Sequence, residues 1–135
     1  MVYSKNMKNR AGDWLRQAEN ELAWAADSMK AGYWAQACFA SQQVAEKALK
    51  AIALARGASE VRSHSLARIA EALDIDGEIL RMSKRLDMYY ISARYPDAFA
   101  EGAPFEFFDS DQATEAIEFA KTFVARARVE LRTDG

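Results

Sequence analysis

Apolar residues recur at intervals of three and four positions along four long stretches of the chain. This spacing places them on one face of a helix, so each stretch predicts an amphipathic helix with a buried stripe. No stretch has the strict alternation of a β-strand, and we therefore expect an all-α fold. The four long helices are predicted over residues 6–30, 33–56, 78–93 and, after a cap at Asp109 or Ser110, 110–131.

Short connections determine how these helices pack. Gly32 and Gly57 follow the first two predicted helices, as is typical of helix C-termini. So short a link after the first helix favours an antiparallel hairpin. A short helix is predicted over 66–73, after the polar turn 58–63. The pattern therefore predicts an antiparallel four-helix bundle with an additional short helix, in a single domain spanning residues 1–135.

The segment 95–109 is an aromatic-rich connection that contains both prolines of the chain, Pro96 and Pro104. Pro96 disfavours helical geometry at the preceding residue and ends the helix there. Connections of this length are uncommon inside a compact domain and are often functional. We expect this one to dock on the bundle through its aromatic side chains, which are Tyr95, Phe99, Phe105, Phe107 and Phe108.

Charge is distributed unevenly along the 135 residues. The formal net charge of −2 argues against a protein that coats nucleic acid through bulk electrostatics. Residues 1–94 nevertheless carry 14 Lys and Arg against 11 Asp and Glu, whereas residues 95–135 carry 4 against 9. This asymmetry has two interpretations: attraction between two parts of one bundle, or a basic face that holds a phosphate.

The chain has one histidine and one cysteine, which excludes several kinds of site. Zinc sites of the usual Cys/His types, Cys-x-x-Cys redox pairs and di-iron bundles all need more of these residues, so we predict no metal and no cofactor. Cys38 has no partner for an intrachain disulfide, and its neighbours Ala37 and Phe39 indicate a buried thiol. No signal or membrane-spanning stretch is evident, so we expect a cytoplasmic protein without membrane contact.

The second predicted helix carries a run of polar residues on one face: Gln43, Glu46, Lys47 and Lys50. Taken alone, this run predicts a solvated stripe, in which a Glu46–Lys50 pair contributes only ~0.2–0.5 kcal/mol. The alternative is a face that binds a ligand.

His64 lies in the sequence Ser63-His64-Ser65-Leu66, just before the predicted short helix. The serines can cap that helix and leave its first amide groups pointing outward, which would form a site for an anion. The structural alternative is a histidine that only forms hydrogen bonds beside the cap.

A third group of polar residues lies at the end of the helix predicted over 78–93 and just after it. It comprises Tyr89, Tyr90, Arg94, Tyr95 and Asp97. The planar fork of arginine suits a phosphate, and a tyrosine ring offers a surface on which a base stacks. The alternative is an Arg94–Asp97 pair that secures the turn, with the tyrosines in the core.

These residues together resemble a known family, the HEPN domains, whose name means higher eukaryotes and prokaryotes nucleotide-binding. The likeness is to the stand-alone prokaryotic members and covers nearly the whole chain. It implies a helical bundle, a homodimer, and often a minimal nucleotidyltransferase encoded next door as antitoxin. The motifs that carry it are Asp13-Trp14-Leu15, Tyr33-Trp34, the run from Gln42 to Ala51, His64-Ser65-Leu66, Tyr89-Tyr90 and Arg94-Tyr95-Pro96-Asp97.

Many HEPN proteins are metal-independent ribonucleases with an arginine and a histidine separated by four to six residues. This chain departs from that motif, because Arg94 is followed at those positions by Phe99, Ala100 and Glu101. The first hypothesis is therefore a homodimeric module that binds a nucleotide or a nucleotidyltransferase partner. The second is a ribonuclease toxin in which Arg94 stabilises phosphate charge and a tyrosine or Asp97 carries the proton. The third is a purely structural assembly module.

The predicted site lies where the polar face of the second helix approaches the Arg94 turn. Arg94 is the single catalytic candidate, and the missing histidine favours binding of a nucleotide or RNA over catalysis. The predicted ligand-binding residues are Gln43, Glu46, Lys47, Lys50, His64, Tyr90, Arg94 and Asp97.

Overall fold

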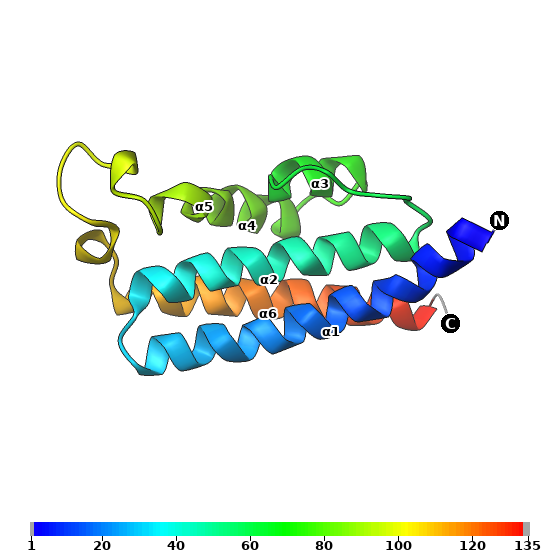
Figure 1. The fold of residues 1–135 in the computed structure, drawn as a ribbon, viewed down its shortest axis with the longest axis horizontal. Coiled ribbons are helices and arrows are strands. Elements are labelled where there is room, and N and C mark those ends of the chain that lie inside the picture. Colours follow the sequence, from blue (N-terminus) through cyan, green and yellow to red (C-terminus); the bar gives the residue numbers. More distant parts are fainter. Residues whose placement is uncertain (1, 134–135) are drawn as a thin grey trace.

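A computed structural model of the chain describes residues 2–133, so the predicted domain 1–135 includes three residues outside this range. Within it the chain forms helices and no strand, which confirms the all-α fold class (Figure 1). The helices are α1 (Val2–Lys30), α2 (Trp34–Ala55), α3 (Leu66–Ala72), α4 (Glu78–Asp87), α5 (Tyr89–Ser92) and α6 (Ser110–Thr133), with two 3-10 turns, η1 (Pro96–Ala98) and η2 (Pro104–Phe107).

Helix α2 is the centre of the bundle. It contacts α1, α3, α4, α5 and α6, and Figure 1 shows α1 and α6 along one side of it and α3, α4 and α5 along the other. Successive long helices run in opposite directions, as the short links predict. Because neighbours cover α2 on several sides, 17 of its 22 residues are buried. The neighbouring helices therefore shield polar residues of α2 from water, unlike polar residues on a surface helix.

The reversal between α1 and α2 is set by Gly32. Its φ of 86° is a left-handed conformation that glycine adopts without a steric penalty. The Gly32 N–H donates to the Met29 carbonyl at 3.0 Å, and the Tyr33 N–H donates to the Ser28 carbonyl at 2.9 Å. These two bonds form a Schellman motif, which satisfies the last carbonyl groups of α1 and turns the chain into α2.

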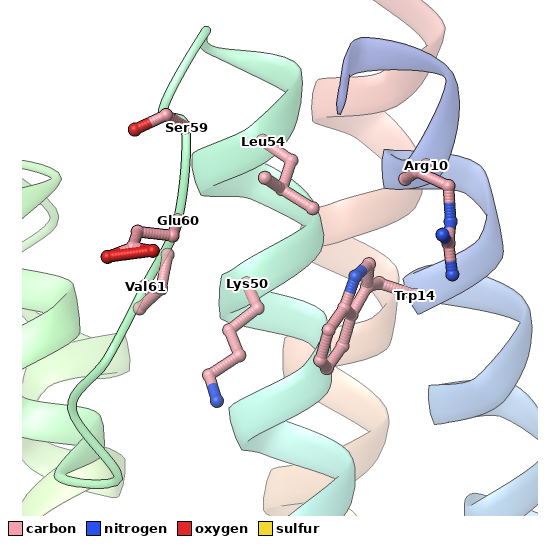
Figure 2. A pocket seen from close by; sticks show the side chains of 7 residues that line it. All are labelled: Arg10, Trp14, Lys50, Leu54, Ser59, Glu60 and Val61. Carbon is pink, nitrogen blue, oxygen red and sulfur yellow. The ribbon is translucent and has the colours of Figure 1, made fainter. Parts of the chain in front are cut away.

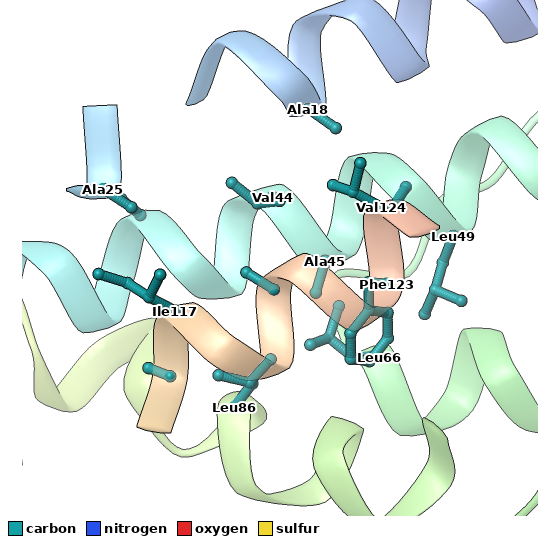
Figure 3. Packing of buried hydrophobic residues seen from close by; sticks show 14 of the residues in the cluster. Ala18, Ala25, Val44, Ala45, Leu49, Leu66, Leu86, Ile117, Phe123 and Val124 are labelled. Carbon is teal, nitrogen blue, oxygen red and sulfur yellow. The ribbon is translucent and has the colours of Figure 1, made fainter. Parts of the chain in front are cut away.

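The core joins all the helices through a few large side chains and many alanines (Figure 3). Leu49 of α2 and Phe123 of α6 are fully buried, together with Leu66 of α3 and Leu86 of α4. Burial of one such side chain contributes about 1.5–3 kcal/mol to the stability of the folded protein. Buried alanines on α1, among them Ala18, let the helices approach closely. None of the helices described between residues 2 and 133 is long and apolar enough to cross a membrane.

The helix predicted over residues 78–93 is divided in two at Met88. The Met88 N–H bonds to the carbonyl of Arg85, three residues earlier, at 3.3 Å. This tighter bond interrupts the four-residue spacing of an α-helix, and α5 resumes at Tyr89. The prediction of one continuous helix was therefore wrong at this point, although α4 and α5 together form the fourth arm of the bundle.

The aromatic connection docks only in part. Phe108 is buried and Phe99 packs partly against the core, whereas Phe105 is 69% exposed and Phe107 is 48% exposed. Phe107 stacks on Phe99, with ring centroids 4.4 Å apart, so that this contact lies within the connection itself. The connection is therefore docked on the bundle, as predicted, through Phe99 and Phe108, whereas Phe105 and Phe107 remain exposed.

Two smaller predictions are confirmed at the start of α6 and in α2. Asp109 caps α6: its Oδ1 accepts from the Gln112 N–H at 2.9 Å, and the Gln112 side chain accepts from the Asp109 N–H at 3.0 Å. The Cys38 thiol is buried, and this burial raises its pKa to about 12. The thiol is therefore protonated at neutral pH and is a poor nucleophile.

Candidate functional site

The polar face of α2 is built around a buried ion pair. Glu46 is 5% exposed and Lys50 is 8% exposed, and the Lys50 Nζ donates to Glu46 Oε2 at 2.8 Å. The prediction of a solvated stripe was wrong for these two residues, because the central position of α2 removes them from water. A buried charge is costly unless it is paired, so each of these residues depends on the other.

His64 is bound to the same carboxylate. Its Nδ1 lies 3.2 Å from Glu46 Oε2, and its backbone carbonyl accepts a bond from Gln42 Nε2 at 3.4 Å. Because an ionised carboxylate only accepts hydrogen bonds, this geometry assigns the proton of a neutral imidazole to Nδ1. The side chain is 59% exposed, which leaves Nε2 as the nitrogen available to a ligand.

Tyr90 connects His64 to Arg94. The His64 and Tyr90 rings are stacked, with centroids 5.3 Å apart and planes 15° from parallel. The Arg94 Cζ lies 4.8 Å from the centre of the same Tyr90 ring. Histidine and arginine, which lie thirty positions apart in the sequence, thus contact one tyrosine side chain.

The Arg94 guanidinium lies in an aromatic cage formed by Phe39, Tyr90 and Tyr95. Its Cζ is 4.3 Å from the centre of the Phe39 ring and 4.8 Å from that of Tyr95. Its Nε donates to the Tyr90 carbonyl at 2.9 Å. Among the side chains that the structure describes, none is a carboxylate within 4.0 Å of this cation. Cation–π contacts hold the arginine in place, and its other donors face solvent.

The structure does not form the Arg94–Asp97 pair that was one of the two interpretations of this turn. Asp97 lies in the exposed turn η1 and has no ion pair with Arg94. The proline turn directs the Asp97 carboxylate away from Arg94. The Arg94 guanidinium instead packs over side chains of α2 and α5. Of the neighbouring tyrosines, Tyr89 packs against the core, but Tyr90 and Tyr95 surround Arg94. Asp97 is thus separate from the cage.

Gln43 and Lys47 lie toward α1 instead of toward Arg94. The Lys47 Nζ forms an ion pair with Glu21 Oε1 at 2.8 Å and donates to Gln43 Oε1 at 3.4 Å. The structure therefore connects five of the eight predicted residues directly in one series of contacts. Among the described contacts, Gln43 and Lys47 reach this series only through Gln42, whose Oε1 accepts from Gln43 Nε2 at 2.7 Å and whose Nε2 donates to the His64 carbonyl. Asp97 lies outside it. The connected residues are Lys50, Glu46, His64, Tyr90 and Arg94.

The start of α3 is already occupied by a carboxylate of the protein. Ser65 caps the helix, as predicted, by accepting from the Arg68 N–H. Asp87 of α4 then accepts from the Leu66 N–H at 2.7 Å and from the Ala67 N–H at 3.1 Å. These are the amide groups that an anion would need, so the structure rules out the anion-site interpretation of this helix start and favours the structural alternative.

Two important residues were missed in the sequence. Phe39 lies on the same face of α2 as Gln43, Glu46 and Lys50, four, seven and eleven positions before them, and its helical spacing could have revealed it. Asp87 gave no signal, because its contact with α3 spans 21 residues. Among the described side chains, no group of three or more His, Cys, Asp or Glu is placed to hold a metal ion.

The helical bundle and the order of its elements define a HEPN-type domain, and comparison with known proteins agrees. The chain belongs to the HEPN domain family, whose model matches residues 11–130. TT1696 from Thermus thermophilus is similar in structure, with 39% identity, a TM-score of 0.85, and coverage of 90% of this chain and 98% of that one. ST0689, an archaeal HEPN homologue, has 36% identity and a TM-score of 0.80, with the same two coverages. No curated protein is significantly similar.

Proposed function

We propose that this HEPN protein binds the phosphate of a nucleotide or of RNA through Arg94, with the base stacked on the adjacent aromatic side chains. The observation that carries the proposal is the aromatic cage: three rings hold the guanidinium, and no described carboxylate neutralises it. A guanidinium has five N–H donors, and Arg94 uses its Nε for the Tyr90 carbonyl. The terminal N–H groups form no described hydrogen bond, and a guanidinium can offer such groups to an anion in pairs.

The surroundings of Arg94 support a base as well as a phosphate. Tyr95 is 47% exposed, and a tyrosine face of this kind contributes about 1–3 kcal/mol when a base stacks on it. The exposed imidazole of His64 offers a further flat surface with a hydrogen-bonding nitrogen. A nucleotide therefore matches this group of side chains better than inorganic phosphate does.

Nuclear magnetic resonance titration tests the proposal. Addition of AMP, ATP or a short RNA to 15N-labelled protein should shift the Arg94 Nε–H resonance and the backbone amides of Tyr90 and Tyr95, with saturation. Amides on the far side of the bundle, in the middle of α6, serve as the internal control. If none of the three ligands shifts the Arg94 resonance, or if all amides shift uniformly, the proposal fails.

A metal-independent ribonuclease is the second proposed function, and the position of His64 favours it. Under this proposal His64 takes the place of the histidine missing from the expected motif, and the support is that His64 and Arg94 contact the same Tyr90 ring. Glu46 orients the imidazole so that Nε2 can accept the proton of a ribose 2′-OH as its oxygen attacks phosphorus. Arg94 would stabilise the charge that develops on the phosphate, while the bond to the 5′-oxygen breaks and that oxygen takes up a proton from water to leave as a hydroxyl group.

An RNA cleavage assay in EDTA tests this second function. Cleavage by the wild type should be lost in His64→Ala and in Arg94→Ala, and retained in Arg81→Ala. Arg81 is a suitable control because it is an exposed arginine of α4 without a described side-chain partner. Absence of cleavage, or cleavage that persists in His64→Ala, contradicts the ribonuclease proposal and leaves nucleotide binding to its own test.

We also propose a homodimer in which a second copy of the chain covers the exposed apolar side chains beside the site. Met88 and Ile91 are exposed although they are large and hydrophobic. Sedimentation should give twice the mass of the 15.1 kDa chain, and Ile91→Glu should yield monomers. Val129→Glu, at an exposed apolar residue of α6, should stay dimeric. A monomeric wild type contradicts the proposal.

A minimal nucleotidyltransferase is the proposed protein partner, in a toxin–antitoxin setting, and the family resemblance is its support. Co-expression with a nucleotidyltransferase encoded next to this chain should give a complex that survives gel filtration. Separate elution of the two proteins would contradict the partnership. If the protein is only a structural module, Arg94→Ala should change dimer stability and no ligand response.

A further inference from the structure

A second polar and aromatic surface surrounds Trp14, on the other side of the Glu46–Lys50 pair from Arg94. A cavity of about 290 Å³ opens beside the indole, between α1, α2 and the connection to α3 (Figure 2). Leu54 and Val61 provide apolar walls, and Arg10 and Lys50 provide positive charge. A neighbouring cavity of about 310 Å³ shares Arg10 and Trp14 with it. The indole thus lines both cavities.

Lys50 presents unfilled donors in this cavity. Its Nζ lies 5.5 Å from the centre of the Trp14 ring, and Glu46 Oε2 is the one acceptor bonded to it among the described residues. An ammonium group has three N–H donors, so two are left for a ligand or water. The side chain is 8% exposed, and such donors gain most from a bound acceptor because bulk water is largely excluded.

Arg10 is the second cation of the cavity, and its present partner is easily replaced. It pairs with Asp13 at 3.0 Å, but both side chains are well exposed. Exposed pairs of this kind are weak, so a ligand anion can compete for the guanidinium. Arg16 pairs with the same Asp13 from the other side along α1 but does not line the cavity.

We infer that the Trp14 cavity binds a planar aromatic carboxylate of one or two rings. The ring packs against the indole beside the walls of Leu54 and Val61, and the carboxylate accepts bonds from Arg10. Lys50, which Figure 2 shows on the other side of the indole from Arg10, adds positive charge to the cavity. The volume lies at the lower end of the range for small-molecule sites, which suits a molecule of this size. Glu60 also lines the cavity, although it pairs with Arg62. This acid disfavours a polyanion, so the ligand carries a single negative charge and differs from the nucleotide proposed at Arg94.

Calorimetric titration with indole-3-carboxylate tests the inference directly. The wild type should bind it with saturation, and neutral indole should bind at least about tenfold more weakly because it lacks the anion. A saturating concentration of AMP should not displace it, because the two sites are separate. Equal affinity for indole, no binding of the carboxylate at millimolar concentration, or competition by AMP would each overturn the inference.

Variants of the two arginines beside Asp13 provide the matched comparison. Arg10→Ala should weaken indole-3-carboxylate binding about tenfold, whereas Arg16→Ala should leave the affinity unchanged. Both residues are exposed, so neither substitution threatens the fold. Trp14→Leu should abolish binding, with circular dichroism confirming that the helices are intact. Equal affinities of the Arg10→Ala and Arg16→Ala proteins would overturn the assignment of the anion site.

Discussion

Glu46 Oε2 lies 3.2 Å from His64 Nδ1 and accepts a bond from the Lys50 ammonium at 2.8 Å. One buried carboxylate oxygen therefore orients a histidine on one side and a lysine on the other. The second oxygen of Glu46, Oε1, is buried without a hydrogen-bond partner among the described residues. Glu46 therefore contacts one residue of each of the two proposed ligand sites.

Substitution of Glu46 by glutamine should strongly destabilise the protein. Glutamine preserves the size of the side chain but leaves the Lys50 ammonium buried without a counter-charge, which costs about 3–5 kcal/mol of unfolding free energy. Urea denaturation measures this change. Glu118→Gln is the control, because its pair with Lys121 is exposed, and it should change the free energy by less than about 0.5 kcal/mol. Equal losses of unfolding free energy in Glu46→Gln and Glu118→Gln would show that the buried pair matters no more for stability than the exposed one.

The buried Glu46–Lys50 pair and the exposed Glu118–Lys121 pair have similar helical spacing, which shows the limit of what spacing alone can predict. The separations of Gln43, Glu46 and Lys50 correctly indicate a shared face of one helix. They do not reveal whether that face meets water, which depends on how distant segments pack over α2. The spacing therefore predicted the right residues in a solvated stripe, whereas the structure buries two of them in an ion pair.

The relation between His64 and Arg94 was beyond sequence reasoning for a similar reason. A motif search looks for the histidine a few positions after the arginine, whereas here Tyr90 brings the two together across thirty positions. The spacing of apolar residues at intervals of three and four predicted the long helices well, because each apolar stripe depends only on residues close together in the sequence. The division at Met88 and the cap by Asp87 depend on local bonding and distant contacts that leave no periodic signal.

Removal of the Asp87 carboxylate should loosen α3. Asp87→Ala deletes the acceptor for the Leu66 and Ala67 amides and should lower the unfolding free energy by about 1–2 kcal/mol. Hydrogen exchange should accelerate at these two amides in particular. Asp76→Ala serves as the control, because Asp76 is exposed and has no described partner. Unchanged exchange at Leu66 and Ala67 in Asp87→Ala would argue against the cap.

The Cys38 thiol should make stability depend on alkaline pH. Its folded pKa is raised from 9.0 to about 12, mainly by desolvation and further by the nearby Asp109 and Glu115. Between these values the unfolded thiol has lost its proton while the folded thiol retains it, so stability falls as pH rises. The slope attributable to this group is at most about 1.4 kcal/mol per pH unit.

Comparison with Cys38→Ala isolates this effect from other groups, including Tyr89, whose pKa burial also raises. The difference in unfolding free energy between wild type and Cys38→Ala should be constant below pH 9, the ordinary pKa of the thiol. It should then shift in favour of the variant as the pH increases. Parallel curves throughout the alkaline range would mean that the folded thiol titrates normally.

The affinity for AMP of three proteins tests the central claim about the aromatic cage: wild type, Arg94→Ala and Arg81→Ala. Isothermal titration calorimetry should show that Arg94→Ala raises the dissociation constant at least about tenfold, because a charge-assisted hydrogen bond to phosphate is lost. Arg81→Ala, which removes an equal charge from an exposed part of α4, should match the wild type. The same dissociation constant for wild type and Arg94→Ala would contradict the proposed phosphate site.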